Sequence, residues 1–186
     1  MAKTEERGHK MAMNTTPRPC GECTSCCRLI GIDKCDDGGS ADFPFDKPAD
    51  ANCKHCRSGH GCEIFGTELF PSLCKTYSCL WKDPGFLPEG WRPDKVNAIC
   101  HMEGYVHGRV VIRVIVDRHK PVSDSFSRWV DVCVAGGIAF VIQSGGRIAV
   151  VSEHPELSKA IENTLLAKHN DTITKHVSTT LRKLNG

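Results

Sequence analysis

The distribution of cysteine constrains this chain more than any other feature. Ten of its twelve cysteines lie between Cys20 and Cys79, and only Cys100 and Cys133 lie outside that stretch. This density is typical of disulfide-bonded domains in oxidising compartments or of thiolate-bound metal in reducing ones. The residues from Met1 to Pro19 are polar and contain no hydrophobic segment of the kind found in export signals. We therefore expect a cytoplasmic (cytosolic) protein whose cysteines bind metal.

The charge and the apolar content argue against other classes of protein. Lys and Arg number 24 against 22 Asp and Glu, which gives a formal net charge of +2. A surface that reads nucleic acid shows a larger basic excess. No apolar run approaches the ~20 residues that a membrane helix needs. The expected partner is a metal ion, with neither a membrane nor nucleic acid, while a protein partner stays open.

The periodicity of the chain divides it into three expected parts. Residues 1–17 are charged and polar without an apolar period, so we expect a disordered tail. Residues 18–82 contain few large aliphatic side chains, and such a segment cannot offset its chain entropy without a cross-link. We expect this segment to be a cysteine-cluster metal-binding module. Residues 83–186 show regular periods and predict an α+β region with C-terminal helices.

Three segments of the last part predict strands. Val106–Val116 is rich in β-branched residues, with apolar side chains on both of its faces. Ile138–Gln143 and Arg147–Val151 are two further strands, and the intervening Ser144-Gly145-Gly146 suits a hairpin. The expected fold class is therefore α+β, with an irregular, metal-stapled, cysteine-rich N-terminal module packed on a small antiparallel sheet with helices.

Two helices are expected beside these strands. Apolar residues recur at helical spacing from Val122 to Cys133, with Ser123 as a candidate N-cap and Gly136-Gly137 as a stop. Pro155 suits the first turn of a second helix. The expected buried face of that helix comprises Leu157, Ile161, Leu165 and Leu166. A helical period continues through Ile173, Val177, Leu181 and Leu184.

The spacing of the cysteines is that of metal ligands. Two residues between cysteines allow a tight turn that aims both sulfurs at one ion. Neighbouring side chains diverge in extended backbone, so Cys26 and Cys27 are expected to serve different metals or one polynuclear centre. Nine cysteines are candidate ligands, enough for two four-cysteine sites: Cys20, Cys23, Cys26, Cys27, Cys53, Cys56, Cys62, Cys74 and Cys79.

Other interpretations of the same residues are weaker. A thioredoxin-like redox pair at Cys53 and Cys56 would follow a strand, and residues 47–52 show no strand pattern. His55 and His60 lie inside the cluster and could replace a thiolate, but neither has the paired spacing of a zinc site.

The remaining cysteines are interpreted as ordinary thiols. Cys133 falls on the apolar face of the expected helix and should pack as a small hydrophobic residue. Cys100 precedes His101, but the partners of a cysteine–histidine catalytic pair meet across a fold, not along the chain.

Four ordered blocks resemble a known family. They are Cys20-Gly-Glu-Cys23-Thr-Ser-Cys26-Cys27-Arg28, Lys47-Pro48-Ala49-Asp50-Ala51-Asn52-Cys53-Lys54-His55-Cys56, Gly61-Cys62-Glu63-Ile64-Phe65 and Pro71-Ser72-Leu73-Cys74. Together they resemble the CxxCxxCC zinc- or iron-chelating family, also called YkgJ-type cysteine cluster proteins, over about residues 18–95. The resemblance implies metal or iron–sulfur binding through these cysteines. Phe70-Pro71 departs from the family's Arg-Pro, and Cys35 matches no family position, so Cys35 is left outside the ligand set.

The expected function is metal binding, while the kind of metal and the biological role both stay open. Thiolates select zinc and iron alike, so zinc, iron and an iron–sulfur cluster are all compatible with the ligands. The vicinal pair and the excess of ligands favour an iron-containing centre. One alternative is a redox enzyme or electron-transfer protein that uses an iron–sulfur centre, and another is a zinc-stabilised protein-interaction module. Residues 83–186 contain no acid, base or nucleotide motif that names a reaction, so enzymatic activity stays open.

Overall fold

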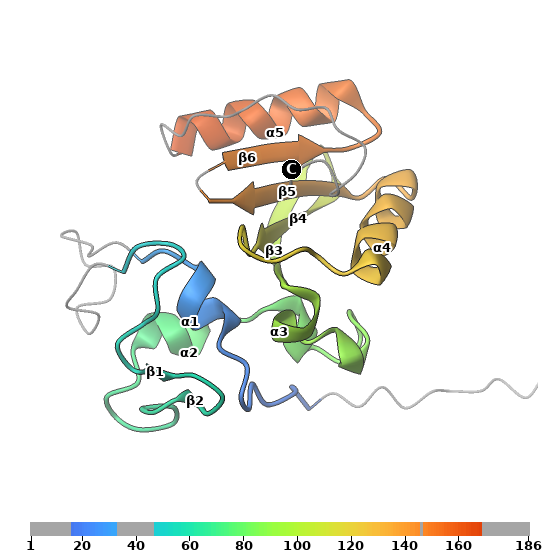
Figure 1. The fold of residues 1–186 in the computed structure, drawn as a ribbon. Helices are drawn as coiled ribbons and strands as arrows, with labels where there is room; N and C mark the ends of the chain where they lie inside the picture. The colour runs from blue at the N-terminus through green and yellow to red at the C-terminus, as the bar shows by residue number, and fades with distance from the viewer. Residues whose placement is uncertain (1–15, 33–46, 146, 169–186) are drawn as a thin grey trace, which may run out of the picture.

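A mixed four-stranded sheet forms the centre of the α+β structure, which is a computed structural model that describes residues 16–32, 47–145 and 147–168 (Figure 1). The sheet order is β3 (Ala98–Val106), β4 (Arg109–Val116), β5 (Ala139–Ser144) and β6 (Arg147–Val151). Several expectations fall outside the described residues: most of the 1–17 tail, Cys35, and the helical period at Ile173, Val177, Leu181 and Leu184.

The pairing of the strands corrects one expectation. β3 with β4 and β5 with β6 are antiparallel, and the β5–β6 hairpin is confirmed. β4 and β5 instead pair in parallel, from Val111 opposite Ala139 to Ile115 opposite Gln143. Between them the chain returns through α4 (Asp124–Ala135), the kind of crossover that a parallel pair requires. The expectation of an antiparallel sheet is therefore wrong at this pair.

The expected strand at Val106–Val116 is in fact two strands. Val106 ends β3, while His107 and Gly108 turn the chain with positive φ angles of 50° and 74° before β4 begins at Arg109. No strand was expected at β3, whose His, Glu and Gly residues weaken the apolar alternation on which strand prediction depends. Its ladder is also irregular between Met102 and Gly104.

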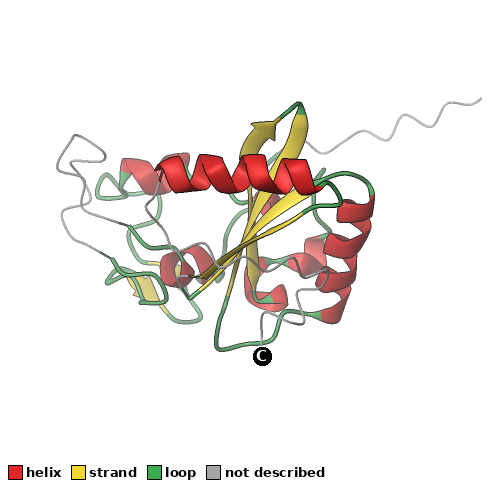
Figure 2. Cartoon of the chain, turned by 90° about the horizontal axis from the view of Figure 1, so that it is seen from above, coloured by secondary structure: helices red, strands yellow, loops and turns green. Residues whose placement is uncertain are grey.

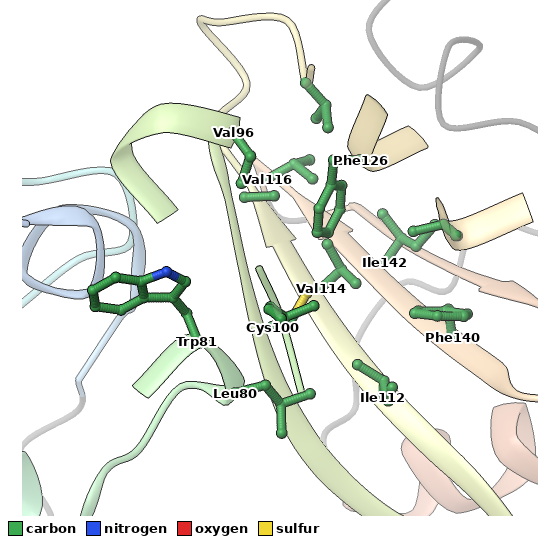
Figure 3. Close-up of a cluster of buried hydrophobic side chains, with 14 residues drawn as sticks. Leu80, Trp81, Val96, Cys100, Ile112, Val114, Val116, Phe126, Phe140 and Ile142 are labelled. Atoms are coloured by element: carbon green, nitrogen blue, oxygen red, sulfur yellow. The ribbon is translucent and has the colours of Figure 1, made fainter. Parts of the chain in front are cut away.

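One face of the sheet carries the largest hydrophobic cluster (Figure 3). Helix α4 covers it with Phe126 and Val130, and its predicted N-cap is confirmed, because the Phe126 amide donates to the Ser123 hydroxyl. Leu80 and Trp81 belong to the same cluster and come from the 3-10 turn η1 (Leu80–Lys82). The end of the cysteine-rich segment thus packs into the core of the sheet. A short helix, α3 (Pro93–Val96), and the 3-10 turn η2 (Glu89–Trp91) precede β3.

The opposite face is covered by two different helices. The predicted second helix is confirmed as α5 (Pro155–Lys168), which crosses over the strands in Figure 2. It buries Leu157, Ile161 and Leu165 against the end of the face that contains Val111. At the other end of this face, Leu29 of helix α1 (Ser25–Leu29) packs on Ile99 and Ile115.

The cysteine-rich segment contains only short elements, as its composition predicts, and lies to one side of the sheet (Figure 1). Besides α1 and η1 they are β1 (Cys56–Arg57), β2 (Gly61–Cys62) and α2 (Ser72–Thr76). Every cysteine in the described ranges is a free thiol. Across those same ranges, no helix has the length and apolar character to cross a membrane.

Candidate metal centre

Two tight turns and one helix position the first cysteines. The Cys23 amide donates to the Cys20 carbonyl at 3.0 Å, and the Cys56 amide donates to the Cys53 carbonyl at 2.9 Å. These two CxxC units therefore form the turn that their spacing predicts. Cys26 lies beside Cys27 within α1, where the backbone is helical and not extended. Their side chains are hydrogen-bonded to each other, so the expected divergence of the two sulfurs is not found.

The thiols of Cys26 and Cys27 have pKa values shifted in opposite directions. The hydrogen bond from the Cys27 thiol lowers the pKa of Cys26 to about 7 against the opposing effect of burial, with help from nearby backbone amides and the Lys47 ammonium. The same hydrogen bond raises the pKa of Cys27, as do burial and the neighbouring sulfurs of Cys26, Cys56 and Cys62. Cys26 is thus the thiol of the pair that ionises first.

Four thiols interact with one another around β1 and β2 and form what we call the hairpin group, namely Cys27, Cys53, Cys56 and Cys62. β1 and β2 pair so that Cys56 faces Cys62, and the Cys53 amide donates to the Cys27 carbonyl at 2.9 Å. Cys56 also hydrogen-bonds the Cys27 side chain, and Cys53 acts electrostatically on Cys56 and Cys62. Burial is the largest cause of the raised pKa values of Cys56 and Cys62.

Two further thiols interact with Cys26. Cys20 and Cys79 interact electrostatically with each other and with Cys26. Burial is the largest cause of the raised pKa of each thiol, while Lys82 opposes that rise at Cys20. We call Cys20, Cys26 and Cys79 the Cys79 group. Cys26 acts on both groups and is the sulfur that links them.

The other candidate ligands are less central. Burial raises the pKa of Cys23, whose sulfur accepts hydrogen bonds from Ser25 and from the Asp94 amide at the start of α3. Cys74 lies in α2 and is partly buried. His60 is exposed and interacts with the Ser58 carbonyl at 3.1 Å, while His55 is partly buried between Cys53 and Cys56 in the sequence.

A buried lysine supports α1 beside these thiols. Lys47 is 3% exposed, and its ammonium donates to the carbonyls of Arg28 and Ile30. Its backbone also exchanges two 2.8 Å hydrogen bonds with Ile32. The charge of Lys47 interacts with Cys26, Cys27 and Cys53. It is a cation well placed to offset thiolate charge.

A close backbone approach holds the hairpin against the first cysteine turn. Gly61 has a φ of 93°, and a β-carbon there would lie 2.6 Å from the Gly21 carbonyl oxygen. Only glycine permits both the conformation and the contact. The Cys20–Cys23 turn and β2 are therefore adjacent although about forty residues separate them.

The donor set suits a thiophilic metal, but its side chains have not converged. The two groups contain seven thiols, which come from α1, the two turns, the hairpin and the residue before η1. Soft sulfur ligands such as these select zinc, copper(I) or iron–sulfur centres. In the part of the chain that the structure describes, no three His, Cys, Asp or Glu side chains are placed to hold one ion. The thiols are gathered as neighbours and not arranged as a finished coordination sphere.

Cys100 lies in the hydrophobic core, and Cys133 packs against that core while only partly buried. Cys100 is 2% exposed in the cluster beneath α4 and lies beside Val114 in Figure 3. Cys133 packs against the same cluster from α4, as its helical position predicts. Burial is the largest cause of the raised pKa of both thiols.

A polar group on the sheet was not anticipated from the sequence. Tyr77, which follows α2, contacts the ring of His101 on β3, and Glu103 and Arg113 lie beside them. Burial and then the charges of Cys79 and Cys26 raise the pKa of Tyr77, while burial lowers that of His101. The spacing of His101 and Glu103 places them on one face of a strand, a signal that is usable only once β3 is recognised.

We compared the chain with models of protein families, with curated proteins and with solved structures, and none of them matched.

Proposed function

We propose that this protein binds zinc, iron or an iron–sulfur cluster through the cysteines between Cys20 and Cys79. The observation that carries the proposal is the set of contacts of Cys26, which interacts with thiols of both the hairpin group and the Cys79 group. These thiols come from separate short segments of the chain. The resemblance of the motif blocks to the CxxCxxCC family supports the same function.

The two groups suggest how the ligands divide. The hairpin group contains four thiols, the number that a four-cysteine site would need once their side chains converge on a metal. The Cys79 group supplies three, and Cys23 or Cys74 would have to complete it. Cys26 and Cys27 contribute to different groups while their side chains remain hydrogen-bonded. A pair of adjacent centres, or one polynuclear centre, accounts for this arrangement better than a single zinc ion, and it favours the iron-containing version.

The bound metal would supply stability that the segment lacks. A structural metal contributes its binding free energy to folding, because the unfolded chain does not hold the site. Here the ligand-bearing segment has few buried aliphatic residues, and Leu29 is its main apolar contact with the second sheet face. Lys47 would offset part of the negative charge of the thiolates.

Metal quantification with an absorption spectrum tests the proposal. Protein purified anaerobically is expected to contain stoichiometric iron or zinc, with sulfur-to-iron charge-transfer bands if the metal is iron. A colourless protein with stoichiometric zinc would overturn the iron version and the electron-transfer role. Folded protein that contains no metal and takes up none would overturn both the zinc version and the iron version of the proposal.

Hydrogen exchange after removal of the metal by a chelator shows which elements the metal stabilises. We expect α1, β1 and β2 to lose protection, while β4 and β5 retain theirs because the core of the sheet is apolar. Cys26→Ser should reproduce the loss. Cys133→Ser is the matched control, since that thiol packs from α4 against the core of the sheet and belongs to neither group. Equal protection in the metal-bound and chelated proteins would contradict a structural metal.

A further inference from the structure

A polar network interrupts the second face of the sheet between the areas covered by α1 and α5. Arg113 of β4 lies there with only 9% exposure. Its Nε and Nη2 donate to the Glu103 carboxylate at 2.7 and 3.0 Å, and its Nη1 donates to the Gln143 side chain at 3.1 Å. The charges of Arg113 and Glu103 are thus satisfied by each other. These hydrogen bonds satisfy the side chains of the network itself. They do not include two polar side chains beside it.

Those two side chains are Tyr77 and His101. The Tyr77 hydroxyl and His101 Nε2 are buried, and neither has a hydrogen-bond partner among the described residues. The two rings pack with centroids 5.8 Å apart, and Nε2 lies 3.9 Å from the Glu103 carboxylate, beyond hydrogen-bond distance. Buried polar groups are nearly always paired, so an orphan hydroxyl in a native fold requires a reason.

The location of Tyr77 indicates what its partner is. Tyr77, Cys26 and Cys79 all pack against the same small cluster, formed by Leu29, Ile99 and Ile115. The hydroxyl therefore lies at the junction between the cysteine-rich segment and the sheet, on the side of the Cys79 group. A phenylalanine would fill the same space. The hydroxyl adds only the ability to form a hydrogen bond.

We propose that Tyr77 is a positioning residue of the metal centre, whose hydroxyl donates a hydrogen bond to a ligand sulfur of the Cys79 group when metal is bound. His101 holds the tyrosine ring in place by packing against it. The inference rests on the proposed metal-binding function and adds to it a residue outside the cysteine motifs. Hydrogen bonds to ligand sulfurs orient the ligands and tune the metal, and loss of such partners typically weakens metal binding by about 10–100-fold.

Cobalt(II) titration of the full-length, metal-free protein tests this role, because thiolate-to-cobalt charge transfer reports directly on the sulfurs. Tyr77→Phe should weaken cobalt binding by about tenfold or more. It should also move the charge-transfer band to lower energy, since the sulfur lone pair loses the hydrogen bond that stabilises it. Tyr105→Phe is the matched control: Tyr105 is the chain's second tyrosine, 70% exposed on β3, and its variant should behave like the wild type.

Substitutions of His101 separate packing from hydrogen bonding. His101→Phe keeps an aromatic ring against Tyr77 and should retain the wild-type cobalt affinity. His101→Ala removes that support and should weaken cobalt binding. Equal losses in the two variants would show that the imidazole acts through its nitrogen, which would overturn the packing role.

Fluorine NMR provides a measurement without a side-chain deletion. The chain has two tyrosines, so labelling with 3-fluorotyrosine gives one signal for Tyr77 and one for Tyr105. Zinc addition should shift the Tyr77 signal and leave the Tyr105 signal in place. If zinc or cobalt binds through thiolates but neither the fluorine signal nor the Tyr77→Phe spectrum changes, the role of Tyr77 is overturned and metal binding stands. If the wild type shows no thiolate-to-cobalt band at all, the proposed function itself fails.

Discussion

The Arg28 guanidinium lies 2.8 Å from the carboxylate of Asp117, whose side chain is completely buried just after β4. Arg28 directly follows Cys27 in α1, so this ion pair ties the helix that carries the vicinal cysteines to the end of a central strand. The Asp117 carboxylate also accepts a hydrogen bond from the His119 amide at 3.0 Å. The candidate metal centre is thereby anchored to the sheet by a charge as well as by apolar contacts.

Removal of the arginine should be costly because it leaves a buried carboxylate unpaired. We expect Arg28→Ala to lower the free energy of unfolding by about 3 kcal/mol. Arg57→Ala is the control, because its 3.9 Å pair with Glu63 is exposed on both sides and should contribute under about 1 kcal/mol. Urea unfolding of both variants at equal metal content measures the difference. Equal losses would show that burial of the Asp117 pair does not strengthen it.

The same pair predicts a dependence of stability on pH. Burial by itself would raise the pKa of Asp117, but the hydrogen bonds from Arg28 and His119 outweigh it and hold the pKa below its usual value. The stabilisation is therefore present above the unfolded pKa of about 3.9 and is lost as the pH falls through the lower folded value. The stability difference between wild type and Asp117→Asn should shrink as the pH falls from about 5 toward 3. A difference that stays constant over this range would contradict the assignment.

Lys47 should be required for the stability of α1. Lys47→Met keeps most of the side-chain volume but leaves the carbonyls of Arg28 and Ile30 without their buried donor. We expect a loss of about 1–3 kcal/mol in the free energy of unfolding. A weaker affinity for zinc should accompany it, because the thiolates lose a nearby cation. Lys95→Met is the control: that lysine is 64% exposed beside Asp94, and wild-type behaviour is expected.

Metal content in cysteine variants should reveal the two groups. Cys62→Ser should lose metal from the hairpin group, and Cys79→Ser should lose it from the other group. Cys26→Ser should affect both, since its sulfur interacts with each. Cys100→Ala should keep the full metal content because that thiol is buried in the sheet core. Elemental analysis per protein chain measures the outcome, and an identical complete loss in all three serine variants would indicate a single inseparable centre.

Short-range patterns in the sequence were sufficient to predict several of the helices, strands and turns. The N-cap at Ser123 and the helical spacing that follows it depend on residues within one or two turns, so α4 could be predicted with its start. The strands β5 and β6 and their hairpin turn depend on similarly short-range patterns. The Cys20–Cys23 and Cys53–Cys56 turns are each closed by a hydrogen bond across three residues, which the spacing alone predicts.

The tertiary structure decided which distant residues meet. The parallel pairing of β4 with β5, the vicinal sulfurs of α1 in hydrogen-bonding contact, and the approach of Tyr77 to His101 have no signature within a few residues of the chain. The twelve cysteines and their spacing determined that this protein concentrates thiols, because tight chelating turns are local structures. How those thiols gather around Cys26, and that Arg28 and Tyr77 join them to the sheet, depends on packing between segments far apart in sequence, which only the folded chain brings together.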